Sequence, residues 1–372
     1  MTEPEKSGIP TLHKFLIAAL VCIAAFGLLE NVARFCEVEV YDPYSLKQQF
    51  AGDSGHGDFL DLHSKFIRDP DLFWKIRPHF GPLSYNHISA TMYTETTNSR
   101  GFRGSEEYGS KPDGVYRIVC LGDSWTYGVM VNDHETYPAQ LCQVLNAESS
   151  PRRFEVLNLG CVGYSSYQGK VLLAKYIRQL APDLVTICFG GNDARRSRLF
   201  SDREQPRIGE WVILVQSMLG KSRFYQVFRN QLLGIKKRAS LGREGAAPIQ
   251  EWPQRVSPDD YEANMREIIS LARQNNCAVV FLFYLGTCPC RDRLEKLSAE
   301  TGIPLVDVNE ILCKNPDYAV KDLSIDYPRD THPNARGYSL IARKLEEVVR
   351  EVADGNPYPA APAPPPENNR RR

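Results

Sequence analysis

The sequence has no excess of charge of either sign, because 45 Lys and Arg residues balance 45 Asp and Glu residues among 372. Proteins that bind nucleic acid carry a basic excess, and the overall excess is missing here. We therefore expect no nucleic-acid partner. The chain also has no internal repeat, and its length suits one large domain or two small ones with an ample core.

A cysteine framework is missing as well, although the sequence contains ten cysteines. Cys120 and Cys188 fall in apolar, strand-like runs, where a thiol behaves as a small hydrophobic side chain. Cys288 and Cys290 form a single C-x-C pair, and no second pair stands at the spacing of a zinc site. We expect neither a disulfide framework nor a bound metal, and no cofactor is indicated.

Residues 15–29 form an uncharged apolar run, bounded by Lys14 and Glu30. The run is shorter than the about 20 residues of a full span and has about the length of a signal-peptide core. Extension to residue 32 gives an acceptable span if Glu30 lies at the membrane interface. Because no clear A-x-A cleavage site follows, we expect an uncleaved transmembrane anchor over residues 15–32, with a cleaved signal peptide as the alternative.

Positive charge marks the orientation of this segment. Lys6 and Lys14 precede the apolar run, while acidic residues follow it. Lys and Arg favour the cytoplasmic side of a membrane. Residues 1–14 are therefore expected to form a cytoplasmic tail, with the rest of the chain outside the cytoplasm.

The character of the sequence changes near residue 113. Residues 33–112 form an irregular extension rich in aromatic and turn-forming residues, whereas residues 113–353 alternate apolar runs with amphipathic stretches. Short continuous apolar runs suit strands that are buried on both faces of a parallel sheet. Such runs occupy residues 116–121, 154–159, 184–189, 278–285 and 304–308. The alternation predicts a three-layer α/β/α domain with a doubly wound, flavodoxin-like parallel sheet.

Two helices of this domain have clear start signals. Ser257 supplies an N-cap and Pro258 a first-turn proline, and Asn334 caps a closing helix. The Pro-rich and then basic composition of residues 354–372 predicts a disordered tail.

Four clusters of polar and glycine residues stand beside the predicted elements. They are residues 122–128 (GDSWTYG) after the first strand, 158–164 (NLGCVGY) after the second, 190–193 (GGND) after the third, and 330–334 (DTHPN) before the last helix. Ligands of open parallel sheets bind beyond the carboxyl ends of the strands. Each cluster alone has an ordinary explanation as a cap or turn. Together they supply what acyl transfer needs: a hydroxyl, a base and donors for an oxyanion.

In this order the four clusters resemble blocks I, II, III and V of the SGNH, or GDSL, hydrolases. The resemblance covers roughly residues 113–353. It implies that Ser124 is the nucleophile and that His332 is the general base, which later protonates the leaving alcohol. It further implies an oxyanion hole made of the backbone N–H groups of Ser124 and Gly163 and the side-chain amide of Asn192. The competing α/β-hydrolase motif G-x-S-x-G is absent, because Thr126 occupies its last position.

The sequence departs from the family pattern at two positions. Trp125 stands where the family motif has Leu. The usual acid lies three residues before the histidine, where this chain has Arg329, so we expect Asp330 to orient His332, with Asp326 in reserve. The resulting D-x-H spacing is similar to that of some SGNH-like O-acetyltransferases.

The third cluster is followed by an insertion, residues 194–256, that is too long for an ordinary connection. It contains 13 Lys and Arg against five Asp and Glu, a net charge of +8 in a neutral protein. One interpretation is a pair of amphipathic helices packed on the sheet with a solvated basic face. The other is a lid that borders the site and meets anionic lipid or a charged glycan.

Three functions from different classes fit these observations. The leading hypothesis is a serine esterase that hydrolyses an acyl ester of a small molecule, lipid or glycan, with acetyl as one candidate acyl group. The second is an O-acyltransferase that uses the same residues on an envelope glycan. The third is a non-catalytic glycan-binding or scaffold module. Residues 96–104 (TTNSRGFRG) have two interpretations: they form a structural belt, or they reach the site.

Overall fold

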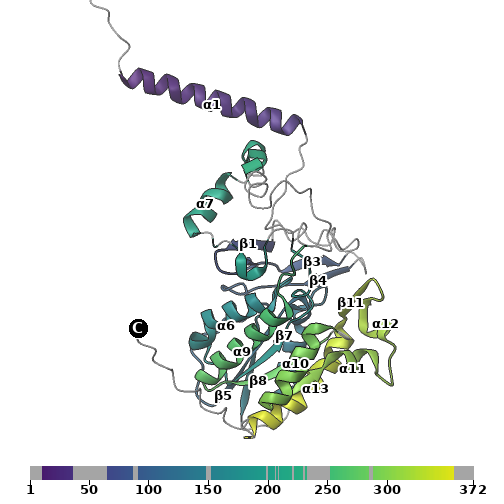
Figure 1. The fold of residues 1–372 in the computed structure, drawn as a ribbon. Coiled ribbons are helices and arrows are strands. Elements are labelled where there is room, and N and C mark those ends of the chain that lie inside the picture. The colour runs from purple at the N-terminus through teal and green to yellow at the C-terminus, as the bar shows by residue number, and fades with distance from the viewer. Residues whose placement is uncertain are drawn as a thin grey trace, which may run out of the picture.

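The computed structural model describes residues 11–36, 65–86, 91–147, 152–197, 200–205, 207, 209–219, 222–228, 231–232, 252–284 and 288–355. Most of the predicted cytoplasmic tail, residues 37–64 of the extension, much of the basic insertion and the predicted disordered tail beyond residue 355 lie outside the described residues. Figure 1 shows one α/β body, with an N-terminal helix that projects away from it.

A five-stranded parallel sheet forms the centre of this body, as the alternation of apolar runs predicts. In spatial order its strands are β6 (Arg153–Asn158), β5 (Val115–Gly122), β7 (Leu184–Cys188), β8 (Ala278–Phe283) and β9 (Leu305–Asp307). Within this sheet the chain forms β5 first, then β6 on one side of β5, and then returns to form β7 on the other side. Strand order therefore reverses beside β5, and such switch points are where open α/β sheets bind ligands.

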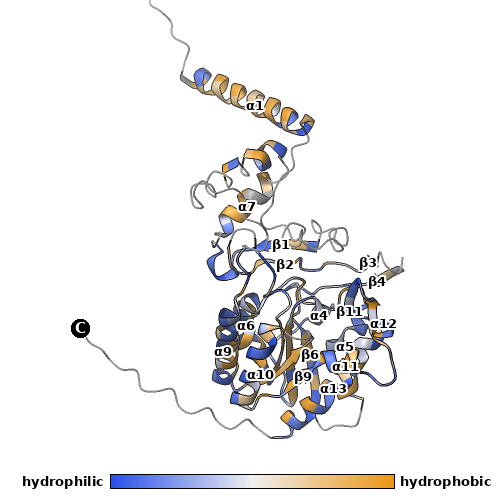
Figure 2. Ribbon diagram, turned by 45° about the vertical axis from the view of Figure 1, so that its right-hand side comes forward, coloured by the Kyte–Doolittle hydropathy of each residue, from blue (hydrophilic) through white to orange (hydrophobic). Residues whose placement is uncertain are grey.

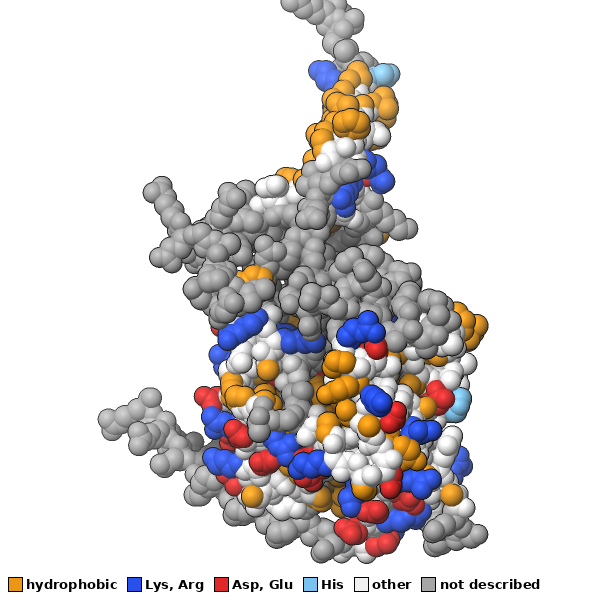
Figure 3. Space-filling model, turned by 90° about the vertical axis from the view of Figure 1, so that its right-hand side faces the viewer, with side chains coloured by type: hydrophobic (Ala, Val, Ile, Leu, Met, Phe, Trp, Pro, Cys, Tyr) orange, Lys and Arg blue, Asp and Glu red, His pale blue; other side chains and the backbone are white. Residues whose placement is uncertain are grey.

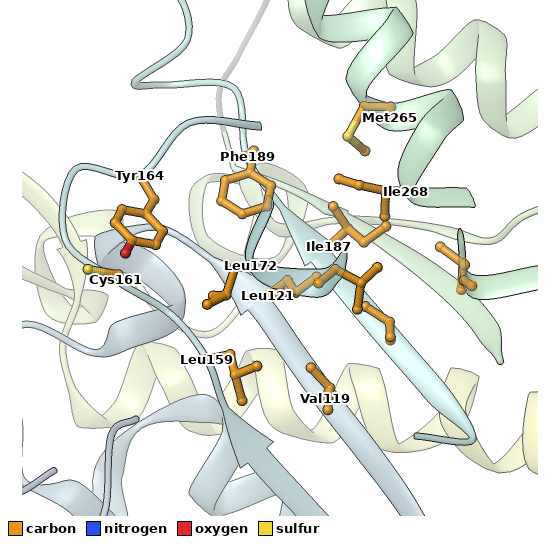
Figure 4. Packing of buried hydrophobic residues seen from close by; sticks show 14 of the residues in the cluster. Val119, Leu121, Leu159, Cys161, Tyr164, Leu172, Ile187, Phe189, Met265 and Ile268 are labelled. Carbon is orange, nitrogen blue, oxygen red and sulfur yellow. The ribbon is translucent and has the colours of Figure 1, made fainter. Parts of the chain in front are cut away.

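Helices cover both faces of the sheet, which confirms the predicted three-layer architecture. Successive residues of β5 point to opposite faces, so Val119 and Leu121 join one core, while Ile118 and Cys120 join the other. Figure 4 shows Val119 and Leu121 among the side chains of the first core. The first face is covered by α6 (Ser166–Leu180), α9 (Pro258–Gln274) and α10 (Pro289–Thr301), and the second by α5 (Tyr137–Leu145), α11 (Val308–Cys313) and α13 (Ala335–Ala353).

The two predicted helix starts are confirmed. The Ser257 side chain accepts a hydrogen bond from the N–H of Asp260, and Pro258 begins α9. The Asn334 side chain accepts from the N–H groups of Arg336 and Gly337 at the start of α13. Short helices outside the two layers include α4 (Ser124–Tyr127), α12 (Val320–Leu323) and two 3-10 turns, Asp133–Glu135 and Asp202–Glu204.

The N-terminal extension is more regular than expected. It contains two antiparallel hairpins, formed by β1 (Phe66–Asp69) with β2 (Phe73–Ile76) and by β3 (Leu83–Asn86) with β4 (Thr91–Thr94). Each strand has only four residues, too few to show the period-two pattern by which strands are predicted. Trp74 and Ile76 are buried in the same core as α6, so this segment is packed onto the α/β body.

The N-terminal helix α1 (Thr11–Phe35) is longer than the predicted span of residues 15–32. It is long and apolar enough to cross a membrane, a property that anchors and signal sequences share. Figure 2 shows its predominantly hydrophobic residues, and Figure 3 shows charges of both signs interspersed over the α/β body instead. Within the insertion, α7 (Glu210–Leu219) and a helical segment at residues 223–228 lie between α1 and the body.

A buried group of charges ties the extension to α4. The Tyr127 hydroxyl donates to Glu95 Oε1 at 2.5 Å, and Lys65 Nζ pairs with the same carboxylate. Arg103 lies 3.4 Å from Glu95 and 2.6 Å from Asp133. Burial favours the neutral acid, but the charges of Lys65 and Arg103 outweigh it and lower the pKa of Glu95 to about 2.

We expect the Glu95→Ala substitution to lower the free energy of unfolding by about 3–5 kcal/mol, because it removes the carboxylate paired with buried Lys65 and one of the two carboxylates paired with buried Arg103. Denaturant unfolding of the detergent-solubilised chain measures the loss. Glu300→Ala is the matched control, since Glu300 forms an exposed pair with Arg266 and its loss costs under about 1 kcal/mol. The Glu95 contribution is present above pH 4.5 and disappears as the pH falls toward about 2. Equal effects of the two substitutions contradict this assignment.

Candidate active site

The structure brings Ser124, His332 and Asp330 together. Ser124 is the first residue of α4, directly beyond the carboxyl end of β5, and Asp123 caps that helix. Ser124 Oγ lies 2.7 Å from His332 Nε2, and His332 Nδ1 lies 2.6 Å from Asp330 Oδ1. The backbone N–H of His332 also donates to Asp330 Oδ1, at 2.9 Å. Asp330 is buried while the His332 side chain is 20% exposed, so solvent reaches the histidine but not the aspartate.

The D-x-H spacing works because these residues lie on a strand. The fourth cluster stands before the last helix, as predicted from the sequence, and its residues Asp330–Pro333 form β11, which pairs with β10 (Ser324–Asp326). Residues two apart on a strand point to the same side, which sets the Asp330 carboxylate beside the His332 ring. The reserve candidate Asp326 instead pairs with Arg329 at 2.9 Å.

Of the three predicted oxyanion donors, Ser124 begins α4, while Gly163 and Asn192 lie in loops. Gly163 has a φ of +80°, a conformation that a residue with a side chain rarely adopts. Asn192 follows β7, and its side-chain amide donates to Asp123 Oδ2 and to the Tyr164 carbonyl, both at 3.1 Å. The amide is therefore held in one orientation by its neighbours.

Asp123 connects the first cluster to the third. Besides Asn192, it accepts hydrogen bonds from the N–H of Trp125 at 3.0 Å and from the Tyr284 hydroxyl at 2.6 Å. Burial raises the pKa of Asp123, and these hydrogen bonds oppose that effect. The Trp125 ring stacks on Tyr284 with centroids 4.2 Å apart and lies 5.7 Å from the His332 ring. The residue that replaces the family leucine thus forms an aromatic wall beside the histidine.

The side chain of Asp193 holds the start of α6. It accepts from the N–H of Ser166 at 3.0 Å and also from the Ser166 hydroxyl. Burial raises the pKa of Asp193 to about 7. This side chain fixes the loop after β7 against the helix that follows the second cluster.

Side chains from distant segments hold the loop that carries Gly163. The indole N–H of Trp74, on β2, donates to the Val162 carbonyl at 3.1 Å. The Arg255 guanidinium donates to the Gly163 carbonyl at 2.6 Å. Together with the bond from Asn192 to Tyr164, these contacts engage three successive carbonyl groups.

Arg255 is itself fixed by a buried ion pair across the base of the insertion. It donates to both carboxylate oxygens of Asp202, at 3.1 and 2.8 Å, and to Gln168 Oε1 at 2.8 Å. Asp202 also accepts from the Ser165 hydroxyl at 2.6 Å. No local pattern in the sequence indicates this pair, because both residues belong to the segment that composition describes only as basic and amphipathic.

Neither a metal cluster nor a disulfide accompanies the site. Within the described part of the chain, no group of three or more His, Cys, Asp or Glu side chains is arranged to hold a metal ion. The ten cysteines, all among the described residues, are free thiols.

Residues 120–340 match the GDSL-like lipase/acylhydrolase family. No curated protein matches the chain. Similar solved structures include the psychrotrophic esterase EstA from Pseudoalteromonas sp., at 14% identity and a TM-score of 0.41, covering 64% of this chain and 99% of that one. The lipase/acylhydrolase from Enterococcus faecalis has 15% identity, a TM-score of 0.39 and coverages of 63% and 96%. A two-domain esterase active on acetylated mannans has 17% identity, a TM-score of 0.40 and coverages of 67% and 52%.

We expect Arg255→Lys to lower kcat for a short-chain aryl ester by about tenfold to a hundredfold with little change in KM. A lysine keeps the charge beside Asp202 but cannot also reach the Gly163 carbonyl and Gln168, so the Gly163 loop loses one restraint. Steady-state kinetics measure kcat and KM separately. Arg203→Lys is the control, because Arg203 belongs to the same insertion but forms an exposed pair with Asp260. A raised KM with unchanged kcat contradicts the positioning role.

Proposed function

Because the chain belongs to the GDSL-like lipase/acylhydrolase family, we propose that it hydrolyses an acyl ester through a covalent acyl-enzyme on Ser124. The observation that carries this mechanism is the 2.7 Å separation of Ser124 Oγ and His332 Nε2. A serine hydroxyl is a weak nucleophile unless an adjacent base accepts its proton, and the histidine stands at hydrogen-bond distance.

In the first step, Ser124 Oγ attacks the ester carbonyl carbon while its proton passes to His332 Nε2. Asp330 supports this transfer in two ways. By accepting the Nδ1–H it keeps Nε2 free to act as the base, and its negative charge stabilises the imidazolium that forms. The proposed acid is thus Asp330 rather than Asp326, whose carboxylate is paired with Arg329.

The tetrahedral intermediate places a negative charge on the former carbonyl oxygen. We assign its stabilisation to the N–H groups of Ser124 and Gly163 and to the Asn192 amide. Asn192 already donates to Asp123 and Tyr164, so the oxyanion must share or displace one of these acceptors. The restraints on the Val162, Gly163 and Tyr164 carbonyls favour donors that are in place before the substrate binds.

The second half of the reaction restores the enzyme. Imidazolium His332 gives its proton to the leaving alkoxide, and the C–O bond to the alcohol breaks. Water then attacks the acyl-enzyme while His332 takes its proton; His332 returns this proton to Ser124 Oγ as the bond from Oγ to the acyl carbon breaks, which frees the serine hydroxyl and a carboxylic acid. Transfer of the acyl group to a glycan hydroxyl would differ only in this second nucleophile. Water is the acceptor that we propose, since the family is one of acylhydrolases.

We further propose that α1 is an uncleaved single-pass anchor with its N-terminus in the cytoplasm, which sets the α/β domain outside. The proposal is supported by the apolar character of α1 and by Lys6 and Lys14, which stand before the apolar run. The substrate class is accordingly an acyl ester of a lipid, glycan or small molecule on the outer side of the membrane.

Replacing Ser124 by Ala should reduce hydrolysis of a short-chain aryl ester by a factor on the order of 10⁴ to 10⁶, because no nucleophile remains. A screen over acyl chain length identifies the preferred ester, and a fluorophosphonate probe should label the wild-type chain at Ser124 but not the variant. Full activity of Ser124→Ala would refute the mechanism. Acyl transfer to an added oligosaccharide that outpaces hydrolysis would replace water as the acceptor.

The two candidate acids can be separated by amide substitutions. Asp330→Asn should lower kcat on the order of 10²- to 10⁴-fold, because the amide no longer holds the correct histidine tautomer. Asp326→Asn removes only an exposed contact with Arg329 and should leave kcat within about twofold. The pH-independent kcat of both variants is the measurement. A larger loss in Asp326→Asn would reverse the assignment.

A further inference from the structure

Helix α7 of the insertion exposes an apolar face. Trp211 is 72% and Met218 is 70% exposed, and Val215 between them is also exposed. Positions 211, 215 and 218 are spaced by one and two helical turns, so these side chains lie on the same side of the helix. Large apolar side chains that gather on one exposed face mark an interaction surface in a soluble domain.

The segment that follows α7 is bound to the end of α1. Glu30 accepts hydrogen bonds from the N–H groups of Arg223 and Phe224, at 3.0 and 2.9 Å, and from the Ser222 hydroxyl at 2.7 Å. The Phe224 ring also meets Phe26 of α1 edge to face, with centroids 5.8 Å apart. These contacts fix the insertion against the last turns of the apolar helix.

The position of Glu30 along α1 gives the depth of these contacts. Eighteen residues separate Leu12 from Glu30, which corresponds to roughly 27 Å of helix at about 1.5 Å per residue. The hydrocarbon core of a bilayer is about 30 Å thick. If α1 spans the membrane, Glu30 and the segment bonded to it therefore lie near one membrane surface.

The amino-acid composition of the insertion is typical of a segment that lies at a membrane surface. Lys221 and Arg223 follow α7 directly, and further basic residues follow in the sequence at Arg229 and 236–238. Helices that lie in the plane of a membrane combine an apolar face containing Trp, Leu or Phe with neighbouring Lys and Arg that meet the headgroups. Figure 2 shows hydrophobic residues along α7, which lies between α1 and the α/β body.

We propose that α7 is an interfacial membrane helix, whose face with Trp211, Val215 and Met218 enters the bilayer that α1 spans. The proposal rests on the membrane span proposed for α1 but not on the catalytic mechanism. It gives the protein two contacts with one membrane, so the α/β domain is held at the surface instead of swinging on a single tether. Because α7 also packs against β1, whose hairpin partner carries Trp74, the membrane contact and the Gly163 loop share one chain of packed residues.

Tryptophan fluorescence offers a direct test. The chain has four Trp residues, of which Trp74 and Trp125 are buried, while Trp252 is partly exposed. The full-length protein is reconstituted into phosphatidylcholine vesicles with or without brominated acyl chains, which quench tryptophan on contact. We expect brominated lipid to reduce the emission of the wild-type protein and of Trp252→Phe. The reduction should disappear in Trp211→Phe.

A second variant guards against an indirect effect of removing Trp211. Met218→Trp in the Trp211→Phe background should restore quenching, because position 218 lies on the same face. Arg203→Trp in that background, on an exposed polar site elsewhere in the insertion, should not. Restoration at both positions contradicts an oriented helix.

Two further measurements separate the possible failures. Flotation of the same vesicles reports whether the protein binds the membrane, and hydrolysis of an aryl ester reports whether the enzyme is active. Protein that floats but shows no quenching dependent on Trp211 overturns the proposal, and α7 then faces water, a second copy or another protein. Protein that does not float overturns the anchor and this proposal together. Neither result depends on the mechanism, since the inactive Ser124→Ala chain should give the same quenching as the wild type.

Discussion

The loop from Val162 to Tyr164 lies in neither a helix nor a strand, so its buried carbonyl groups need partners from elsewhere. Three side chains supply them: Trp74 from the N-terminal hairpin, Arg255 from the insertion and Asn192 from the end of β7. Three separate parts of the chain, namely the N-terminal extension, the insertion and the loop after β7, thus bind this one loop. The extension and the insertion are therefore parts of the site's scaffold, even though neither contributes a residue to the proposed reaction itself.

The residues just before this loop, at the end of β6, are fitted closely against the helix that carries Ser124. A Cβ on Gly160 would lie 2.3 Å from the backbone nitrogen of Tyr127, so only glycine permits this approach. The Asn158 amide donates to the Thr126 carbonyl at 2.8 Å and thereby joins the ends of β6 and α4. On the other side of α4, the Tyr127 hydroxyl meets the buried carboxylate of Glu95. The serine is thus positioned by contacts with its neighbours on both sides rather than by the four-residue helix alone.

The sequence predicts the sheet and its layers well because strands buried on both faces leave short continuous apolar runs, which differ in length from the single long apolar run of α1. It also leads to Ser124, Gly163, Asn192 and His332, since each lies in a short contiguous cluster beside a predicted element. It does not lead to Trp74, Asp202 or Arg255, whose contacts join residues far apart in the chain and carry no local pattern. The hairpins of the extension were missed for a related reason: their strands are too short for periodicity, and their burial depends on the partner surface. The sequence favoured Asp330 over Asp326 on spacing alone, whereas the contacts that support this choice, Asp330 with His332 and Asp326 with Arg329, are visible only in the structure.

The ion pair between Asp202 and Arg255 closes the insertion at its base, leaving some fifty residues between two points that are in contact. The entropy lost on closing a loop grows only with the logarithm of its length, about 0.6 kcal/mol per doubling. The intervening segment can therefore lengthen, shorten or be exchanged for another with little loss of stability, provided that the ion pair between Asp202 and Arg255 is kept. The segment between Asp202 and Arg255 can therefore be replaced without rebuilding the site. Evolution or a protein engineer could in this way change the location of the enzyme while the backbone around Gly163 stays the same.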